Sequence, residues 1–188
     1  MSDTGQLWAR IGALGFVCVL LQVAAVSQVV LFGVNADLTP LIVADVGLLT
    51  GAVAGSLLGF GMGLLLDLML VQTLGTAALI YTLVGYGAGR LRELRAPQST
   101  FTPLGIAAAA TAVATIGYSL VEFLLGRNAP VSLLLAREIA ATILLNTLIA
   151  LPVFAVVRRW LAPVLEDDPR RRRRRTYTTG GLSPLSRR

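Results

Sequence analysis

Histidine and lysine are both absent from this chain of 188 residues, and cysteine occurs once, as Cys18. Without histidine the chain lacks the commonest metal ligand and the commonest general base, so sites that depend on it are excluded. A single cysteine cannot form a disulfide within one chain. Charged residues make up 14% of the sequence and hydrophobic residues 55%, whereas a soluble domain averages about 25% charged residues. This composition indicates a polytopic membrane protein.

The charge is concentrated at the C-terminal end of the chain. Residues 158–188 hold ten of the sixteen arginines against three acids. From residue 162 onward the sequence is polar and rich in Arg, Thr, Gly, Ser and Pro, so we expect a disordered cytoplasmic tail over 162–188. Its arginines are expected to contact anionic lipid, or an acidic cytosolic partner; nucleic-acid binding is not expected, because no aromatic residues are interleaved with them. The basic residues assigned to this role are Arg158, Arg159, Arg170, Arg171, Arg172, Arg173, Arg174 and Arg175.

Residues 1–161 are predicted to form a domain of six transmembrane helices. The apolar segments are 11–32, 38–50, 51–71, 76–89, 103–125 and 131–157. The first is too long for the apolar part of a cleaved signal, so we interpret it as a retained helix. The second would reach only ~20 Å of a ~30 Å hydrocarbon core and is the weakest span. The positive-inside rule places both termini and the arginines at 90, 92 and 95 in the cytoplasm.

The connections between these segments are too short to hold a soluble catalytic domain. The sequence contains no nucleophile-elbow motif and no spacing typical of metal ligands. We therefore expect a protein that is not an enzyme, binds no cofactor or metal, and acts through surfaces within the membrane.

Several polar residues fall inside the apolar segments, where a charge is costly and usually faces protein. Asp45 and Asp67 are the leading candidates for direct contact with a partner or ligand. Glu122 and Arg137 could pair across the last two helices, and Asn146 is a candidate for hydrogen bonds between helices. Structural hydrogen bonding between helices remains the alternative for the whole set.

The third segment carries a regular glycine row. It comprises Gly51, Gly55, Gly59 and Gly63, and the next step of four residues falls on Asp67. Small residues at this spacing let helices pack closely, and the fourth segment offers a matching small surface at Ala77, Ala78, Gly85 and Gly89. Each step of four turns ~400°, so the row drifts ~40° per step. We therefore expect either a crossing neighbour or two neighbours, with Asp67 facing away from Gly51 and toward a partner.

Residues GLLTGAVAGSLLGFGMGLLLDLM, followed by TLGTAALIYTLVGYGAGRL, resemble the MreD family of rod-shape-determining membrane proteins. The later ATILLNTLIALPVF is similar to the Asn-containing final span of that family. The resemblance covers roughly residues 7–160 and does not include the arginine-rich tail. The positions that match the family pattern are Gly55, Gly59, Gly63, Asp67, Gly75, Gly85, Tyr86 and Asn146.

The resemblance implies a component of the cell-elongation machinery in the bacterial cytoplasmic membrane. Such proteins associate with MreC and, directly or indirectly, with RodA, a class B penicillin-binding transpeptidase and MreB. It also implies a fold similar to the six-helix substrate-binding subunits of ECF vitamin transporters. We therefore expect a non-enzymatic scaffold for lateral peptidoglycan synthesis that binds MreC. A vitamin-binding subunit of an ECF-type transporter is the alternative.

Overall fold

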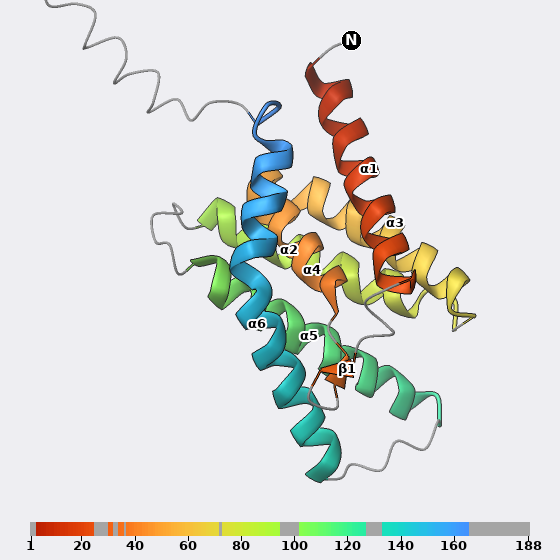
Figure 1. Cartoon of the computed structure of the whole chain (residues 1–188). Coiled ribbons are helices and arrows are strands. Elements are labelled where there is room, and N and C mark those ends of the chain that lie inside the picture. The colour runs from red at the N-terminus through yellow and green to blue at the C-terminus, as the bar shows by residue number, and fades with distance from the viewer. Residues whose placement is uncertain are drawn as a thin grey trace, which may run out of the picture.

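The chain folds into a bundle of helices (Figure 1). The structure, a computed structural model, describes residues 3–24, 30–31, 34–35, 37–71, 73–94, 102–126 and 133–165. Within them lie six helices and one pair of short antiparallel strands, in the order α1 (Asp3–Ala24), β1 (Val30–Leu31), β2 (Val34–Asn35), α2 (Leu38–Thr50), α3 (Ala52–Met69), α4 (Thr76–Leu94), α5 (Thr102–Leu124) and α6 (Leu133–Leu161). The all-α class and the six helices are confirmed.

Four of these helices are long and apolar enough to cross a membrane: Thr4–Ala24, Ala52–Met69, Pro103–Leu124 and Ala136–Leu161. The chain is therefore a multi-pass membrane protein. α2 is shorter, and α4 continues into charged turns that contain Arg90 and Arg92.

Several boundaries differ from those that hydropathy predicts: α1 begins at Asp3 and not at residue 11, and α4 and α6 end at Leu94 and Leu161 and not at residues 89 and 157. The first helix ends at Ala24, and residues 30–31, expected to continue it, form β1, which pairs with β2 beyond that segment. Apolar periodicity alone does not separate helix from strand, and the β-branched Val30 and Val34 favour strand. Gly51 lies between α2 and α3, not inside a helix. Its φ of 108° is readily adopted only by glycine, which allows α3 to fold back on α2.

The shortest helix occupies the centre of the bundle. α2 contacts all five other helices, and ten consecutive residues, from Thr39 to Leu48, are buried. Asp37 begins this helix, because its side chain accepts a hydrogen bond from the backbone N–H of Thr39 at 3.0 Å. A helix surrounded on every side can be apolar throughout, which explains why α2 lacks a polar face.

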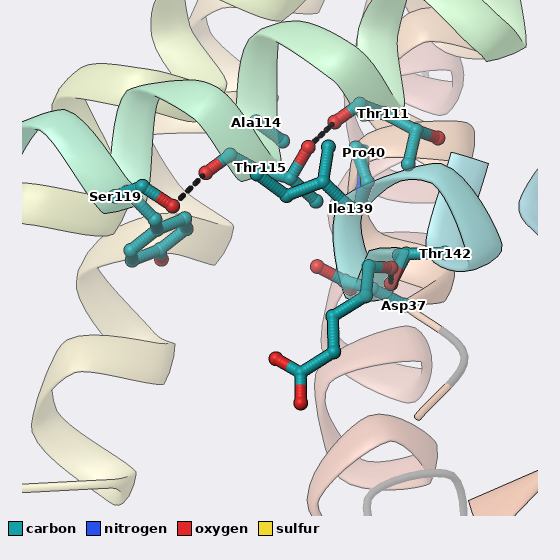
Figure 2. A pocket seen from close by; sticks show the side chains of 10 residues that line it. Asp37, Pro40, Thr111, Ala114, Thr115, Ser119, Ile139 and Thr142 are labelled. Carbon is teal, nitrogen blue, oxygen red and sulfur yellow. Dashed lines mark hydrogen bonds between the residues drawn. The ribbon is translucent and has the colours of Figure 1, made fainter. Parts of the chain in front are cut away.

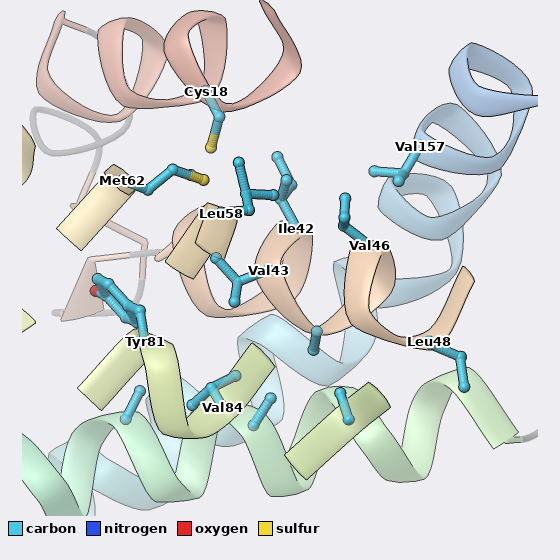
Figure 3. Packing of buried hydrophobic residues seen from close by; sticks show 14 of the residues in the cluster. Cys18, Ile42, Val43, Val46, Leu48, Leu58, Met62, Tyr81, Val84 and Val157 are labelled. Carbon is cyan, nitrogen blue, oxygen red and sulfur yellow. The ribbon is translucent and has the colours of Figure 1, made fainter. Parts of the chain in front are cut away.

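The core around α2 is built mainly from aliphatic side chains (Figure 3). Cys18 of α1 points toward Met62 of α3. On another side of α2, Val46 faces Val157 of α6. The side chains of Cys18, Val46, Met62 and Val157 are all buried, so the two long outer helices are held through α2 and α3.

The beginning of α1 and the end of α6 lie at the same end of the bundle. The Arg10 guanidinium donates to the carbonyl of Trp160 at 2.8 Å, and the Trp160 indole donates to the carbonyl of Arg10 at 3.2 Å. The Arg10 guanidinium carbon also lies 6.0 Å from the centroid of the indole, within cation–π range. These reciprocal contacts tie α1 to α6 and place Arg10 beside the basic end of α6.

Candidate functional site

The glycine row of α3 lies directly against the backbone of α4. A Cβ added at Gly59 would overlap the Tyr81 carbonyl, and one added at Gly63 would overlap the backbone of Ala77 and Ala78. A Cβ at Gly55 would lie 2.6 Å from both the Gly47 Cα of α2 and the Gly85 carbonyl oxygen of α4. These glycines therefore stand where no other residue fits without moving a helix.

One neighbour follows the row along most of its length. The facing positions of α4 also recur every fourth residue, and two of them are Gly85, which meets Gly55, and Gly89, which meets Ala52. The reason is that two antiparallel helices packed along their rows of every fourth residue remain in register when they cross at an angle. The structure places α4 against Gly55, Gly59 and Gly63, and α2 also meets the row, at Gly55.

The two ends of the row, Gly51 and Asp67, have roles different from the close helix packing made by the three glycines between them. Asp67 is 1% exposed. Its carboxylate accepts hydrogen bonds from the backbone N–H groups of Gly75 at 2.8 Å and Ala77 at 3.1 Å, at the beginning of α4. Asp67 was expected to face away from Gly51 and toward a partner; its carboxylate is instead buried and closes the α3–α4 turn, where Gly75 has a φ of 94°.

A second polar network joins α2, α4, α5 and α6. Asn146 of α6, which is fully buried, donates to the carbonyl of Asp37 at 2.9 Å and to the Thr111 hydroxyl at 3.2 Å. Its own carbonyl accepts from the Asp37 backbone N–H at 3.3 Å. Tyr81 of α4 donates to the Asp37 carboxylate at 3.0 Å, and its ring meets Tyr118 edge to face. Sequence reasoning found Asn146 but missed Asp37, which it had assigned to a connecting loop.

Asp45 is the other buried carboxylate of α2. It is 4% exposed, and its Oδ2 atom has no hydrogen-bond partner in the described part of the chain. Because Asp45 is buried inside the bundle, a partner could not contact it directly in this arrangement. A role for Asp45 in partner contact stays a prediction.

The charged residues near the α5–α6 connection do not pair as expected. Glu122 and Arg137 are both exposed, and no ion pair joins these two side chains, which the structure describes. Arg158 and Arg159 lie in the last turn of α6 and are exposed. Arg170 to Arg175, with the rest of residues 166–188, lie outside the described residues, as does the expected disorder of that tail.

A polar pocket opens between α5, α6 and the beginning of α2 (Figure 2). Its volume is about 220 Å³. Hydroxyl groups of α5 follow one another along the wall, and Asp37 and Thr142 lie across from them. The residues that line it are Asp37, Pro40, Thr111, Ala114, Thr115, Tyr118, Ser119, Glu138, Ile139 and Thr142.

Two apolar grooves lie elsewhere on the bundle. The α1/α3 groove, of about 490 Å³, is lined by Trp8, Ile11, Gly12, Gly15, Phe16, Leu57, Leu58, Gly61, Met62 and Leu65. The α4/α5 groove, of about 240 Å³, is lined by Leu83, Val84, Gly87, Ala88, Leu91, Ile106, Ala109, Ala110 and Val113. A Cβ added at Gly12, Gly61 or Gly87 would meet no described atom within 4 Å. These three glycines therefore serve no close packing inside the described bundle.

The family model described as rod shape-determining protein MreD matches residues 8–162. The chain belongs to the MreD family. The match covers every described helix apart from the first residues of α1. Searches of curated proteins and of solved structures found no match.

Membership assigns this MreD-family protein a role in determining rod shape, within a family of structural membrane proteins that is not known for catalysis. Two features of the matched region were missed by reading the sequence. Gly47 of α2 packs against Gly85 and Ala88 of α4, and it could have been found by extending the search for small residues into the short helix. The polar pocket could not have been found in this way, because its walls come from three helices whose contacts the sequence does not specify.

Proposed function

We propose that this protein is a non-enzymatic scaffold of the cell-elongation complex that binds the transmembrane helix of MreC in the α1/α3 groove. Holding that helix would keep the extracytoplasmic part of MreC close to the RodA synthase and its class B transpeptidase, with MreB on the cytoplasmic side. The observation that carries the proposal is the groove itself, in a family that determines rod shape.

The two apolar grooves differ in how well they suit a helix. The α1/α3 groove has about twice the volume of the α4/α5 groove. Gly12 of α1 and Gly61 of α3 lie in its walls with open space in front of them. Glycine costs ~1 kcal/mol relative to alanine inside a helix, and close approach of a partner helix offsets that cost. The aromatic Trp8, at the beginning of α1, suits the membrane–water interface.

The proposed arrangement has both termini in the cytoplasm of a bacterium, in its cytoplasmic membrane. The Arg10–Trp160 contacts support it, because they put the beginning of α1 and the end of α6 at one end of the bundle. Arg158 and Arg159 are at the same end, as the positive-inside rule requires of cytoplasmic residues. A reporter active in only one compartment, fused to residue 1, tests the orientation.

Crosslinking in living cells tests the groove. In a Cys18→Ala variant, single cysteines are placed at Gly12, Phe16 and Leu57 of the α1/α3 groove. Matched cysteines at Leu83 and Ala109 probe the α4/α5 groove. We expect disulfide crosslinks to a cysteine series in the MreC transmembrane helix from the first set, with a period of three to four residues along that helix.

Crosslinks that are equally strong from both grooves, or absent from the α1/α3 set, would contradict the proposal. Gly61→Leu and Gly87→Leu form a second, matched pair. Both glycines face open space, so both variants should accumulate normally, and only Gly61→Leu should lose co-purification of MreC and fail to restore rod shape.

Solute binding, as in the substrate subunits of ECF-type transporters, is the second candidate function. The polar pocket is the observation that favours it, because a pure scaffold does not need a cavity lined by hydroxyl groups and carboxylates. Native mass spectrometry of the protein purified under mild conditions distinguishes the two: a retained small metabolite would argue against pure scaffolding.

A further inference from the structure

Three of the hydroxyl groups that line the polar pocket already donate their protons to backbone carbonyls. Thr115 donates to the carbonyl of Thr111 at 2.9 Å, and Ser119 donates to the carbonyl of Thr115 at 3.0 Å (Figure 2). On the opposite wall, Thr142 donates to the carbonyl of Glu138 at 2.9 Å. A hydroxyl has one proton and two lone pairs. These three oxygens therefore present lone pairs to the cavity and act toward a ligand as hydrogen-bond acceptors.

Two carboxyl groups add to this acceptor surface. Asp37 is held in place from both sides, because its Oδ1 accepts from the Thr39 N–H and its Oδ2 from the Tyr81 hydroxyl. Each oxygen keeps a further lone pair. Glu138 lines the pocket from α6 and is exposed, so its carboxylate can meet an incoming group at the mouth.

None of the ten described residues that line the pocket is cationic. Arg137, the neighbour of Glu138 in sequence, is exposed and does not line it. The two donors to the Asp37 carboxylate are neutral, and Glu138 is exposed, so no positive charge among the lining residues offsets either carboxyl group. The same surface would repel an anion. The pocket is thus complementary to a group that carries positive charge and several N–H donors.

We propose that the polar pocket binds a primary ammonium group, with Glu138 and Asp37 supplying charge and the hydroxyl oxygens of Thr115, Ser119 and Thr142 accepting its N–H bonds. This inference does not depend on where MreC binds, since the pocket lies on α2, α5 and α6 and the α1/α3 groove on other helices. Two sources could supply the group: the headgroup of phosphatidylethanolamine or a free small amine. The pocket volume of about 220 Å³ admits either.

The experiment uses the full chain in nanodiscs of phosphatidylglycerol mixed with either phosphatidylethanolamine or phosphatidylcholine. Phosphatidylcholine has the same charge but a quaternary nitrogen without N–H donors. Native mass spectrometry after release measures which lipid stays bound. We expect at least about tenfold preferential retention of phosphatidylethanolamine, the ratio that the loss of one charge-assisted hydrogen bond produces.

Glu138→Gln removes the charge at the mouth and keeps the shape, and Ser119→Ala removes one acceptor from the wall. Both should lower the preference several-fold. Glu122→Gln is the matched control, because Glu122 is an exposed carboxylate on the same pair of helices that does not line the pocket. It should bind like the unmodified protein.

A separate arm titrates ethanolamine into the protein in phosphatidylglycerol nanodiscs and follows the shift in thermal stability. Saturable stabilisation by ethanolamine without retention of phosphatidylethanolamine assigns the pocket to a free amine. Retention of the lipid assigns it to the headgroup. If the two lipids are retained equally and ethanolamine has no effect, or if Glu138→Gln leaves both signals unchanged, the pocket is not an ammonium site.

Discussion

Replacing Gly55 by alanine tests whether close backbone contact holds this bundle together. The added Cβ would lie 2.6 Å from Gly47 of α2 and from Gly85 of α4. That is about 0.8 Å short of the 3.4 Å at which ordinary contact begins. Because two helices are involved, moving α3 away from one does not relieve the overlap with the other.

Gly61→Ala is the control on the same helix. Both substitutions gain ~1 kcal/mol of helix propensity, but a Cβ at Gly61 meets no described atom within 4 Å. Overpacking of a well-packed interior costs ~1–3 kcal/mol. The helix-propensity gain is the same in both variants, so the free energy of unfolding of Gly55→Ala should be lower than that of Gly61→Ala by about 1–3 kcal/mol.

The measurement is reversible unfolding in mixed micelles by titration with sodium dodecyl sulfate, followed by circular dichroism. A difference of this size corresponds to a change of about five- to 150-fold in the unfolding equilibrium constant. If Gly55→Ala and Gly61→Ala have the same stability within error, the glycine row is not a packing device and its regular spacing needs another explanation.

Three further substitutions address the polar contacts. Asp67→Ala leaves the N–H groups of Gly75 and Ala77 without their acceptor and should cost ~1–3 kcal/mol of unfolding free energy per buried group. Asp67→Asn keeps one acceptor oxygen and should cost less. Equal losses in the two variants would argue against the role of Asp67 in closing the α3–α4 turn. Asn146→Leu removes the bonds to Asp37 and Thr111 and should lower the unfolding free energy by ~1–3 kcal/mol, whereas an unchanged midpoint would show that the network contributes nothing. Trp160→Phe removes one hydrogen bond to Arg10; as this contact is partly exposed we expect a loss below ~1 kcal/mol, seen as a small fall in midpoint, and no loss of rod shape.

Much of the bundle could be predicted from the sequence because its strongest signals are local. The second helix follows the predicted range, Leu38–Thr50, since Asp37 supplies a cap at one end and Gly51 a break at the other. The antiparallel packing of α3 on α4 followed from glycines at a fixed spacing beside a tight turn. Such features depend on a few neighbouring residues and are readable one segment at a time.

The remaining features depend on contacts between distant segments. Asp67 could have pointed toward a partner or toward the N–H groups of the next helix, and only the position of α4 decides between them. Glu122 and Arg137 are close to the same connection, yet their side chains do not pair. Asp37 resembled an ordinary loop residue because its partners, Tyr81 and Asn146, are 44 and 109 residues away. Hydropathy gives the depth of a residue but not the direction in which it faces.

The central position of α2 has a consequence for how the protein is made. α2 leaves the ribosome second, and at thirteen residues it is too short to span the bilayer comfortably. Its buried surface faces α4, α5 and α6, which are synthesised later. Until those helices arrive, α2 is covered only by α1 and α3. Assembly around α2 is therefore completed only after α6 has been inserted, so a chain truncated before α6 should be recognised and degraded by the quality control of the membrane.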